Sequence, residues 1–346
     1  MQMYSFDPLL DSRWDDLVAF HPQATVFHRT GWLRALAKTY GYRPVVLTYS
    51  PPGQALSTGI AFCEIKSWIT GSRLVSLPFS DHAQPLLSEE RDTLEILDWA
   101  QTARSTFGWS YIELRPLSAP PEWSPTLEIS QTFWLHSLNL SLPIKQLLSN
   151  THKSSFQRRI RHAEREHLEY ERSGSKELID QFYDLLVITR KRHGLLPQPK
   201  SWFANLMSEM SADAGIRLVR KEGVPIAAIF TLRHRNTVVY KYGCSDHRFH
   251  HLAGMPFLFW KLIEESKAEG AEQIDLGRTD SENSSLVEFK DRLGATRTEI
   301  SYLRYPNDAR AQPMHGRRRS SAGRLFALLP RAFSSGLGRL LYRHIG

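Results

Sequence analysis

Apolar residues recur along this chain at two spacings that alternate with each other. Intervals of three and four residues place apolar side chains on one face of a helix, and they occur within 30–40 and 175–193. Short apolar or alternating runs, which indicate strands, occur at 59–65 and 226–233. Because the two patterns succeed one another along the chain, the sequence predicts an α/β protein.

The same pattern predicts the order of the elements. The expected helices lie within 5–24, 30–40, 94–107, 150–170, 175–193, 202–210 and 256–269. The expected strands are 44–49, 59–65, 74–78, 111–115, 131–140, 216–220, 226–233, 237–244, 273–276 and 299–305. The helix at 150–170 carries many charges and few apolar residues, which is typical of an exposed linker helix, although its basic start leaves contact with RNA or phosphate open.

The second half of the chain repeats the first. Gly108-Trp-Ser-Tyr-Ile-Glu-Leu114 aligns without a gap with Gly270-Ala-Glu-Gln-Ile-Asp-Leu276, at an offset of 162 residues. The hairpin strands at 59–62 and 226–229 recur in the same order. A duplicated α/β module accounts for this repetition.

Length and composition fit two globular domains, because 346 residues with 41% hydrophobic and 23% charged residues can bury a substantial core. The expected organisation is a first domain at 1–150, a basic linker helix at 151–172, a second domain at 173–306 that is presumed catalytic, and a tail at 307–346.

The net charge of +8 is confined to that tail. Residues 309–346 hold eight arginines and no acidic residue, so the rest of the chain is neutral. Bulk charge therefore argues against a basic binding fold and for a basic appendage. Apolar residues interleave with the arginines, so residues 317–346 are expected to contact a membrane surface; packing back on the body is the alternative.

Features that report on the compartment favour the cytoplasm. Cys63 and Cys244 lie far apart and form no disulfide framework. The N-terminus lacks the pattern of a signal peptide, and no apolar run reaches the roughly 18 residues of a spanning helix. We expect a cytoplasmic protein that is peripheral on the inner membrane face.

One polar stretch stands out near the end of the second half. The strand 273–276 leads into a predicted polar loop, 277–285, which holds no apolar residue, and the stretch closes on Phe289-Lys290 and Gly294-Ala295. A strand that opens into a polar loop lies where open α/β sheets usually place their sites. A solvated surface turn is the alternative interpretation.

The order of elements and the hairpin Gly223-Val-Pro-Ile-Ala-Ala228 resemble the GNAT superfamily of N-acetyltransferases. The tandem copies, the strand Tyr240-Lys-Tyr-Gly-Cys-Ser245, Asp275-Leu-Gly-Arg278 and Phe289-Lys290 resemble more specifically the Fem-type acyl and aminoacyl transferases. The likeness covers about residues 26–305.

This resemblance implies two tandem GNAT-like domains, each a mixed, mostly antiparallel sheet flanked by helices. It implies no permanently bound cofactor, an acyl donor that is either aminoacyl-tRNA or acyl-coenzyme A, and an envelope-precursor amine as acceptor. Two family features are missing. The first is the coenzyme A loop, whose place is taken by residues 248–256, and this argues against a pyrophosphate held there on backbone N–H groups. The second is the long helical arm of some relatives, of which only residues 151–170 could be a remnant.

Acyl transfer to an amine requires a positioned neutral amine and stabilisation of the charge that develops on the carbonyl oxygen. The resemblance implies that strand ends of the second domain supply these groups. The catalytic candidates are Lys290, Arg278, Asp275 and Tyr242. The substrate-binding candidates are Tyr240, Ser245, Asp81 and His82, the last two in the first domain.

Each catalytic candidate has a structural alternative. The Lys290 ammonium would meet a phosphate or the anionic transition state, or else be solvated beside Asp291. Arg278 would clamp a carboxylate or phosphate, or pair with Asp275 or Asp280. Asp275 would orient the amine or cap the loop.

The tyrosine and cysteine candidates also have more than one possible role. Tyr240 and Tyr242 are expected on one strand face, where they either pack or aim a hydroxyl at the leaving group. Cys244 is a weaker candidate nucleophile, because no histidine is fixed beside it in sequence. His247, His250 and His251 lack a further ligand at metal-binding spacing, so no metal site is expected.

The favoured function is acyl or aminoacyl transfer to an amine of a cell-envelope precursor, belonging to peptidoglycan or a polysaccharide. A catalytically inactive tandem-GNAT protein that binds or scaffolds in envelope or exopolysaccharide assembly is the first alternative. Binding of tRNA without Fem chemistry is the second.

Overall fold

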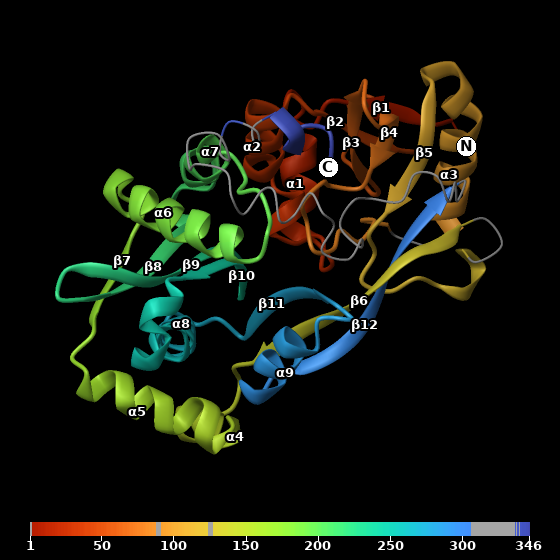
Figure 1. The fold of residues 1–346 in the computed structure, drawn as a ribbon. Coiled ribbons are helices and arrows are strands. Elements are labelled where there is room, and N and C mark those ends of the chain that lie inside the picture. The colour runs from red at the N-terminus through yellow and green to blue at the C-terminus, as the bar shows by residue number, and fades with distance from the viewer. Residues whose placement is uncertain (1, 88–90, 124–126, 306–335, 337, 339) are drawn as a thin grey trace. The chain divides into compact units, whose positions relative to one another are not determined.

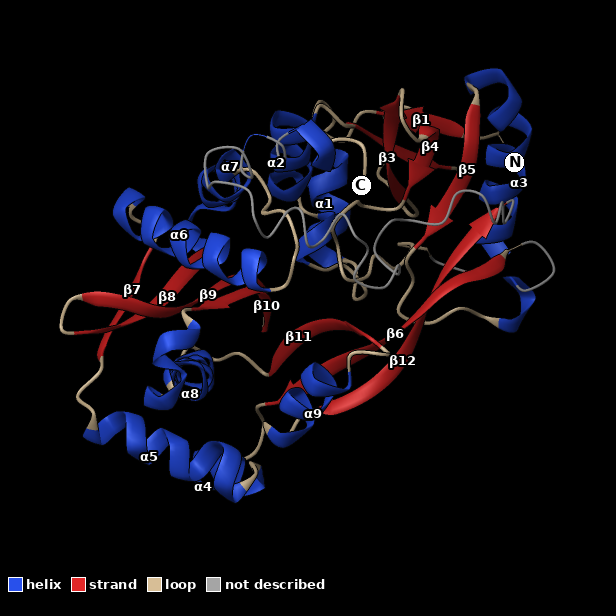
Figure 2. Ribbon diagram, viewed as in Figure 1, coloured by secondary structure: helices blue, strands red, loops and turns tan. Residues whose placement is uncertain are grey.

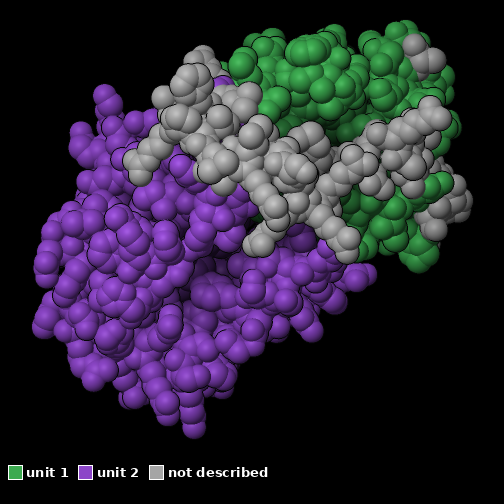
Figure 3. Space-filling view, in the orientation of Figure 1, with its two compact units in different colours: residues 1–133, 300–317, 339–346 green, residues 134–299, 318–338 purple. Residues whose placement is uncertain are grey.

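The computed structural model describes all residues except 1, 88–90, 124–126, 306–335, 337 and 339. Contacts divide the chain into two compact units, shown in Figure 3: residues 1–133, 300–317 and 339–346 form the first, and residues 134–299 and 318–338 form the second. The sequence placed its boundaries at 150, 172 and 306. The units divide elsewhere because β6 (Glu128–Asn139) and β12 (Thr296–Tyr305) each begin in one unit and end in the other.

The first unit contains a sheet with the neighbour order β1-β2-β3-β4-β5-β12-β6. Its remaining elements are β1 (Tyr4–Phe6), α1 (Arg13–Phe20), α2 (Thr30–Tyr40), β2 (Arg43–Thr48), β3 (Ile60–Ser67), β4 (Gly71–Val75), α3 (Arg91–Phe107) and β5 (Trp109–Leu114). The pairs β1–β2, β2–β3 and β3–β4 are antiparallel. Strands β4 and β5 run parallel, because the helix α3 connects them.

The core of the first unit forms on the apolar face of this sheet. Phe62, Leu74 and Ile112 from three strands pack with Ile96 and Leu97 of α3, and all five are essentially buried. The strands and the helix therefore meet through apolar side chains in one core.

The second unit continues with the order β12-β6-β11-β10-β9-β8-β7. Its further elements are α4 (Ile144–Asn150), η3 (Lys153–Gln157), α5 (Arg158–Arg165), β7 (Glu169–Ser173), α6 (Lys176–Arg192), α7 (Lys200–Met210), β8 (Ala214–Lys221), β9 (Val224–His234), β10 (Thr237–Ser245), η5 (His247–Leu252), α8 (Gly254–Ala268), β11 (Gln273–Asp280) and α9 (Ser284–Arg292). Figure 2 shows α6 and α8 on opposite faces of β7 to β10. The mixed, mostly antiparallel sheet flanked by helices confirms the expected fold class.

The predicted exposed helix at 150–170 is wrong in two respects. The side chains of Ile160 and Ala163 on α5 are buried in the core of the second unit. Residues 169–173 form the edge strand β7, in which the hydroxyl of Tyr170 donates to Glu265 at 2.6 Å. The residues of β7 are mostly charged and show no apolar alternation, and charged side chains are common on edge strands.

The predicted polar loop at 277–285 is also wrong. Strand β11 continues to Asp280, and α9 begins at Ser284, where the side chain of Asn283 accepts a hydrogen bond from the backbone N–H of Leu286 at 3.3 Å. Asn is a favoured N-cap residue, so the capped start of α9 was readable in the sequence. Arg278 therefore lies on a strand and not in a loop.

Most of the basic tail lies outside the described residues. Its last seven residues, 340–346, belong to the first unit. The hydroxyl of Tyr42 donates to the carbonyl of Tyr342 at 3.0 Å, and that of Thr70 donates to the carbonyl of His344 at 2.9 Å. The end of the tail thus packs on the body, as the alternative interpretation had it.

Candidate functional site

The ladder between the parallel strands β10 and β11 ends early. Among the described residues it joins Thr237 to Gln273, Val238 to Ile274 and Val239 to Asp275, and no further pair follows. Strand β10 instead stays paired with β9 as far as Ser245 and Ala227. The later part of β10 therefore separates from β11.

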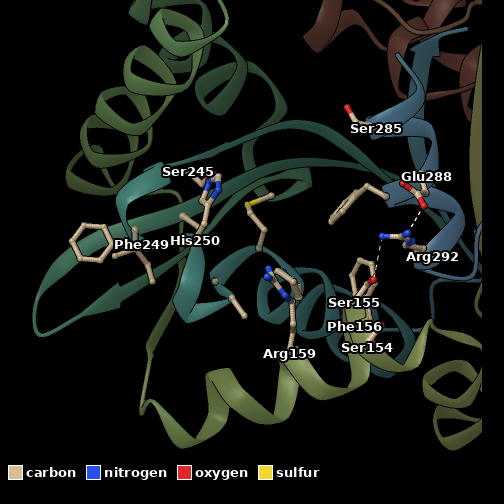
Figure 4. A pocket seen from close by; sticks show the side chains of 17 residues that line it. Ser154, Ser155, Phe156, Arg159, Ser245, Phe249, His250, Ser285, Glu288 and Arg292 are labelled. Carbon is tan, nitrogen blue, oxygen red and sulfur yellow. Dashed lines mark hydrogen bonds and ion pairs between the residues drawn. The ribbon is translucent and has the colours of Figure 1, made fainter. Parts of the chain in front are cut away.

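A pocket of about 480 Å³ lies at the end of β10 (Figure 4). It is enclosed by β9 and β10, by the start of α8, by η3 with α5, and by α9. Its lining residues are Ser154, Ser155, Phe156, Arg159, Ile226, Ala227, Ser245, Phe249, His250, Ala253, Gly254, Met255, Pro256, Ser285, Glu288, Phe289 and Arg292. All of them belong to the second unit.

The start of α8 is pressed against the sheet. Ala253 adopts the left-handed conformation with φ of 60°, and α8 begins at Gly254. A Cβ atom on Gly254 would lie 3.1 Å from Val219 Cγ2 and 3.3 Å from both Ala227 Cβ and Ile226 Cδ1. Glycine therefore allows this close approach without crowding, and the approach brings the N-terminal N–H groups of a long helix to the pocket.

One wall of the pocket carries Ser245 and His250. The Ser245 hydroxyl lies 3.0 Å from His250 Nε2, and Arg192 Nη1 lies 3.3 Å from the same nitrogen. A guanidinium can only donate, so His250 Nε2 accepts and Ser245 donates to it. Burial and the neighbouring Arg192 lower the pKa of His250, which keeps the imidazole neutral at pH 7.

The opposite wall is formed by α9 and η3. Arg292 forms an ion pair with Glu288 and donates to the Ser155 hydroxyl at 3.3 Å, as Figure 4 shows. Arg159 projects into the pocket from α5. Two guanidiniums, a helix N-terminus and a single carboxylate give the pocket a positive balance, which favours an anionic ligand.

Lys290 is buried, with 3% of its side chain exposed, so it is not the solvated lysine of the alternative interpretation. Its ammonium donates to the Gly277 carbonyl at 2.8 Å and to the Thr279 hydroxyl at 2.7 Å. The Asp275 carboxylate accepts from the Gly277 N–H at 2.7 Å. The structure thus brings Lys290 and Asp275 together around the bend of β11, where Arg278 follows half-buried.

Tyr240 and Tyr242 do not share a strand face, contrary to the sequence prediction. The register of β10 on β9 shifts between them. The ring of Tyr240 lies 4.8 Å from that of Phe259 on α8, whereas the Tyr242 hydroxyl accepts from Trp202 Nε1 on α7 at 2.8 Å. A regular strand would put residues two apart on the same face, and the extra residue of a bulge puts them on opposite faces, which alternation in sequence does not reveal.

The bulge places Tyr240 against Gly243. A Cβ atom on Gly243 would lie 2.0 Å from the Tyr240 hydroxyl, so only glycine leaves room for this ring. Burial raises the pKa of Tyr240, which therefore stays a neutral phenol able to donate a proton or a hydrogen bond. Burial likewise raises the pKa of Cys244, so its thiol is not ionised and lacks the character of an activated nucleophile.

Asp81 and His82 belong to the first unit, where both are buried. The Asp81 carbonyl accepts from the Tyr302 hydroxyl at 2.9 Å, and the His82 ring lies 5.4 Å from that of Phe27. Within the described residues, no group of three His, Cys, Asp or Glu side chains is arranged to hold a metal ion. No helix in the described part of the chain has the length and apolar character to cross a membrane.

Sequence reasoning did not assign a role to several pocket residues. The sequence predicts Arg159 only as part of a linker helix and considers His250 only as a metal ligand. It gives Gly254 no role, because the usual coenzyme A loop is absent. The signal that could have found Gly254 is the Ala-Gly pair just before Pro256, which marks a sharp entry into a helix.

Comparison with known proteins agrees with this geometry. Residues 150–291 match the model of the acetyltransferase (GNAT) domain, which confirms the expected enzyme class, an N-acyltransferase of the GNAT type. No curated protein matches the chain.

Among solved structures, FemX superposes with a TM-score of 0.70 at 15% identity over 88% of this chain and 97% of FemX. The C-terminal domain assigned to a lysylphosphatidylglycerol synthetase of Agrobacterium fabrum gives 0.57 at 15% identity, over 87% of this chain and 93% of that one. A tandem GNAT protein from the clavulanic acid biosynthesis pathway gives 0.53 at 8% identity, over 89% and 99%. The resemblance to Fem-type tandem-GNAT proteins is thus confirmed at the level of the fold.

Proposed function

We propose that this protein transfers an acyl or aminoacyl group from an activated donor to an amine of a cell-envelope precursor, belonging to peptidoglycan or a polysaccharide. The observation that carries the proposal is the early end of the β10–β11 ladder beside the pocket at the start of α8. Apart from Arg292, the residues of both lie within the range that matches the GNAT domain model. The fold shared with FemX and with a lysylphosphatidylglycerol synthetase domain supports aminoacyl transfer in particular.

The pocket takes the anionic part of the donor in this proposal. The first turn of α8 offers its backbone N–H groups, and Arg159 and Arg292 supply positive charge. The acyl chain then follows the part of β10 that has left β11, pairing with its backbone as an added strand would. Two donors combine an anionic part with an activated acyl group: acyl-coenzyme A, which carries phosphates and a thioester, and aminoacyl-tRNA, whose terminal nucleotide carries a phosphate and an ester.

In the transfer step, the neutral amine of the acceptor attacks the acyl carbonyl. A C–N bond forms, the C–O bond of an ester or the C–S bond of a thioester breaks, and the proton lost by the amine is matched by one gained by the leaving group. Tyr240, a neutral phenol beside the opened strand, is placed to give that proton. Ser245 binds the donor at the pocket wall.

The group around β11 serves the acceptor side. Lys290 fixes the bend of β11 through its bonds to Gly277 and Thr279 and adds positive charge near the developing oxyanion. Asp275 orients the amine, and Arg278 holds an anionic group of the acceptor. Tyr242 acts through the packing of β10, because its hydroxyl is engaged by Trp202. The substrate-binding role predicted for Asp81 and His82 of the first unit stays a prediction.

The burial of Lys290 also favours a second candidate, a catalytically inactive protein that binds an envelope precursor. A lysine whose ammonium is engaged by β11 can serve structure alone. The two candidates differ in whether an acyl group is moved, so binding without transfer of the donor distinguishes them.

Calorimetric titration tests the donor site. Acetyl-coenzyme A and a charged aminoacyl-tRNA are titrated into the full-length protein at one fixed salt concentration, with wild type, Arg292→Gln and the control Arg233→Gln. Arg233 is partly buried and pairs with Glu269, and neither residue lines the pocket. We expect wild type to bind one of the two donors. Arg292→Gln should lower the affinity for that donor about tenfold, and Arg233→Gln should leave it unchanged. If both variants bind the donor as tightly as wild type, the pocket is not the donor site. If wild type binds neither donor, the inactive binding protein is favoured.

A further inference from the structure

One end of the sheet in the first unit gathers exposed apolar side chains from separate elements. Trp68 and Ile69 form the tip of the β3–β4 hairpin and are 88% and 49% exposed. Phe107, at the end of α3, is 52% exposed, and Leu340 of the C-terminal segment is 63% exposed. Large exposed apolar residues that cluster mark an interaction surface.

Strand register places these residues at the same end. Ser67 pairs with Gly71 across the hairpin turn, and Ser72 pairs with Trp109, the first residue of β5. Phe107 precedes Trp109 by two residues and stacks on it with ring centroids 4.9 Å apart. The turn at 68–70 and the end of α3 are therefore neighbours at one edge of the unit.

The C-terminal segment completes this surface. The ring of His344 lies 5.7 Å from that of Trp68, and its Nδ1 lies 3.0 Å from the Ser67 hydroxyl. The Thr70 hydroxyl donates to the His344 carbonyl. The exposed Arg343 is adjacent to His344, and Leu340 lies in the same C-terminal segment three residues earlier. Figure 1 shows the C-terminus close to the strands of this unit.

Positive charge surrounds the apolar tip. The side chains of Arg43 and Lys66 are 73% and 72% exposed, and both lie within 4 Å of the buried carboxylate of Glu64. One buried acid is shared by two basic residues, and Arg343 adds a third cation. An apolar tip with a basic rim matches an anionic lipid surface, in which aromatic and aliphatic side chains enter the interface and cations meet the head groups.

We propose that this end of the first unit, the tip surface formed by Trp68, Ile69, Phe107 and Leu340 with Arg43, Lys66 and Arg343, docks on an anionic lipid bilayer. The shape and chemistry favour lipid over nucleic acid. Ile69 and Leu340 are aliphatic and offer no stacking face to a base, whereas both gain from entering an acyl boundary. This docking is separate from donor binding in the second unit.

The test is sedimentation of the full-length protein with lipid vesicles at one fixed salt concentration. Vesicles of phosphatidylcholine containing about a third phosphatidylglycerol are compared with pure phosphatidylcholine. The variants are Trp68→Ala/Ile69→Ala, Arg43→Gln/Lys66→Gln and the control Phe20→Ala. Phe20 is 86% exposed, and its neighbour His21 contacts Leu87 beside Gly59, at the other end of β3.

We expect wild type to bind the anionic vesicles and the apolar double variant to lose about tenfold or more in partitioning. The basic double variant should lose about fivefold or more and show weaker salt dependence, and Phe20→Ala should match wild type. All variants retain the basic tail, so their differences report on the tip surface.

Three results would overturn the proposal. The first is vesicle binding by Trp68→Ala/Ile69→Ala equal to that of wild type, which would assign any binding to the tail. The second is an equal loss in Phe20→Ala. The third is no vesicle binding by wild type together with RNA binding that the tip variants abolish. Thermal unfolding midpoints check that the variants fold. Donor titration in solution should be unchanged by all of them, so failure of docking is distinguishable from failure of the proposed transferase activity.

Discussion

At the scale of single residues, Lys290 shows how burial changes the interpretation of a charged side chain. Its ammonium is enclosed and donates to two oxygen atoms of β11. Removing the donor leaves the Gly277 carbonyl and the Thr279 hydroxyl buried without it, which costs about 1–3 kcal/mol. We therefore predict that Lys290→Met lowers the free energy of unfolding by about that amount, measured by urea denaturation, and lowers acyl transfer about tenfold or more.

The matched control for this variant is Lys261→Met, because Lys261 forms a surface pair with Glu264 on α8. Its free energy of unfolding should stay within about 0.5 kcal/mol of wild type. Equal stability of Lys290→Met and Lys261→Met would mean that the bonds to β11 contribute nothing.

A second residue-scale prediction concerns Glu113 in the first unit. Its carboxylate accepts from Arg115 Nε and from Arg304 Nε, each at 2.9 Å, and all three side chains are almost fully buried. Glu113→Gln leaves two buried guanidiniums without a counter-charge. It should lower the free energy of unfolding by about 3–5 kcal/mol.

The pH dependence of stability tests the same cluster. Burial alone would raise the pKa of Glu113, but Arg115 and Arg304 outweigh it and hold the pKa below the ordinary value of 4.5. The stabilisation is therefore complete above about pH 4.5 and is lost as the pH falls through the lower folded-state pKa. Urea titrations between pH 7 and pH 3 should show an acid loss in wild type that is smaller in Glu113→Gln. Parallel profiles would contradict this origin.

At the scale of elements, the start of α8 determines the pocket. Gly254 lets the helix approach β8 and β9, and an added Cβ would press on Val219, Ile226 and Ala227 at 3.1–3.3 Å. We predict that Gly254→Ala displaces the start of α8 by a few tenths of an ångström and weakens donor binding about tenfold. Calorimetric titration measures the change.

The control for Gly254→Ala is Gly215→Ala on β8, where the nearest atom to an added Cβ is Thr231 Oγ1 at 3.9 Å. Donor affinity should be unchanged in this variant. If both alanine variants bind the donor like wild type, the start of α8 is not part of the donor site.

Elements also show what the sequence could predict and what it could not. The continuous apolar run of β9 and the glycine-ended helices were readable because they reflect local burial. Strand β7 was missed because its charged residues pair only at the sheet edge, and the end of β11 was missed because it holds almost no apolar residue. The bulge between Tyr240 and Tyr242 left no trace in the sequence, so their shared face was wrongly predicted.

At the scale of the whole chain, the internal repeat predicted the tandem fold. The alignment of Gly108–Leu114 with Gly270–Leu276 corresponds to β5 in one unit and β11 in the other. The pocket could not be predicted from the sequence, because its side chains come from η3, β10, α8 and α9, which are up to 138 residues apart. The roles proposed for Arg278, Asp275 and Lys290 stay predictions.

The most direct test of the central claim is transfer itself. The full-length protein is incubated with labelled acyl-coenzyme A or labelled aminoacyl-tRNA and an amine-bearing peptidoglycan or polysaccharide precursor, and the mass of the acceptor is measured. The account predicts that one donor adds its acyl mass to the acceptor amine, that Gly254→Ala slows the addition, and that Gly215→Ala does not. Binding of donor and acceptor without any mass gain would contradict acyl transfer and identify a binding protein.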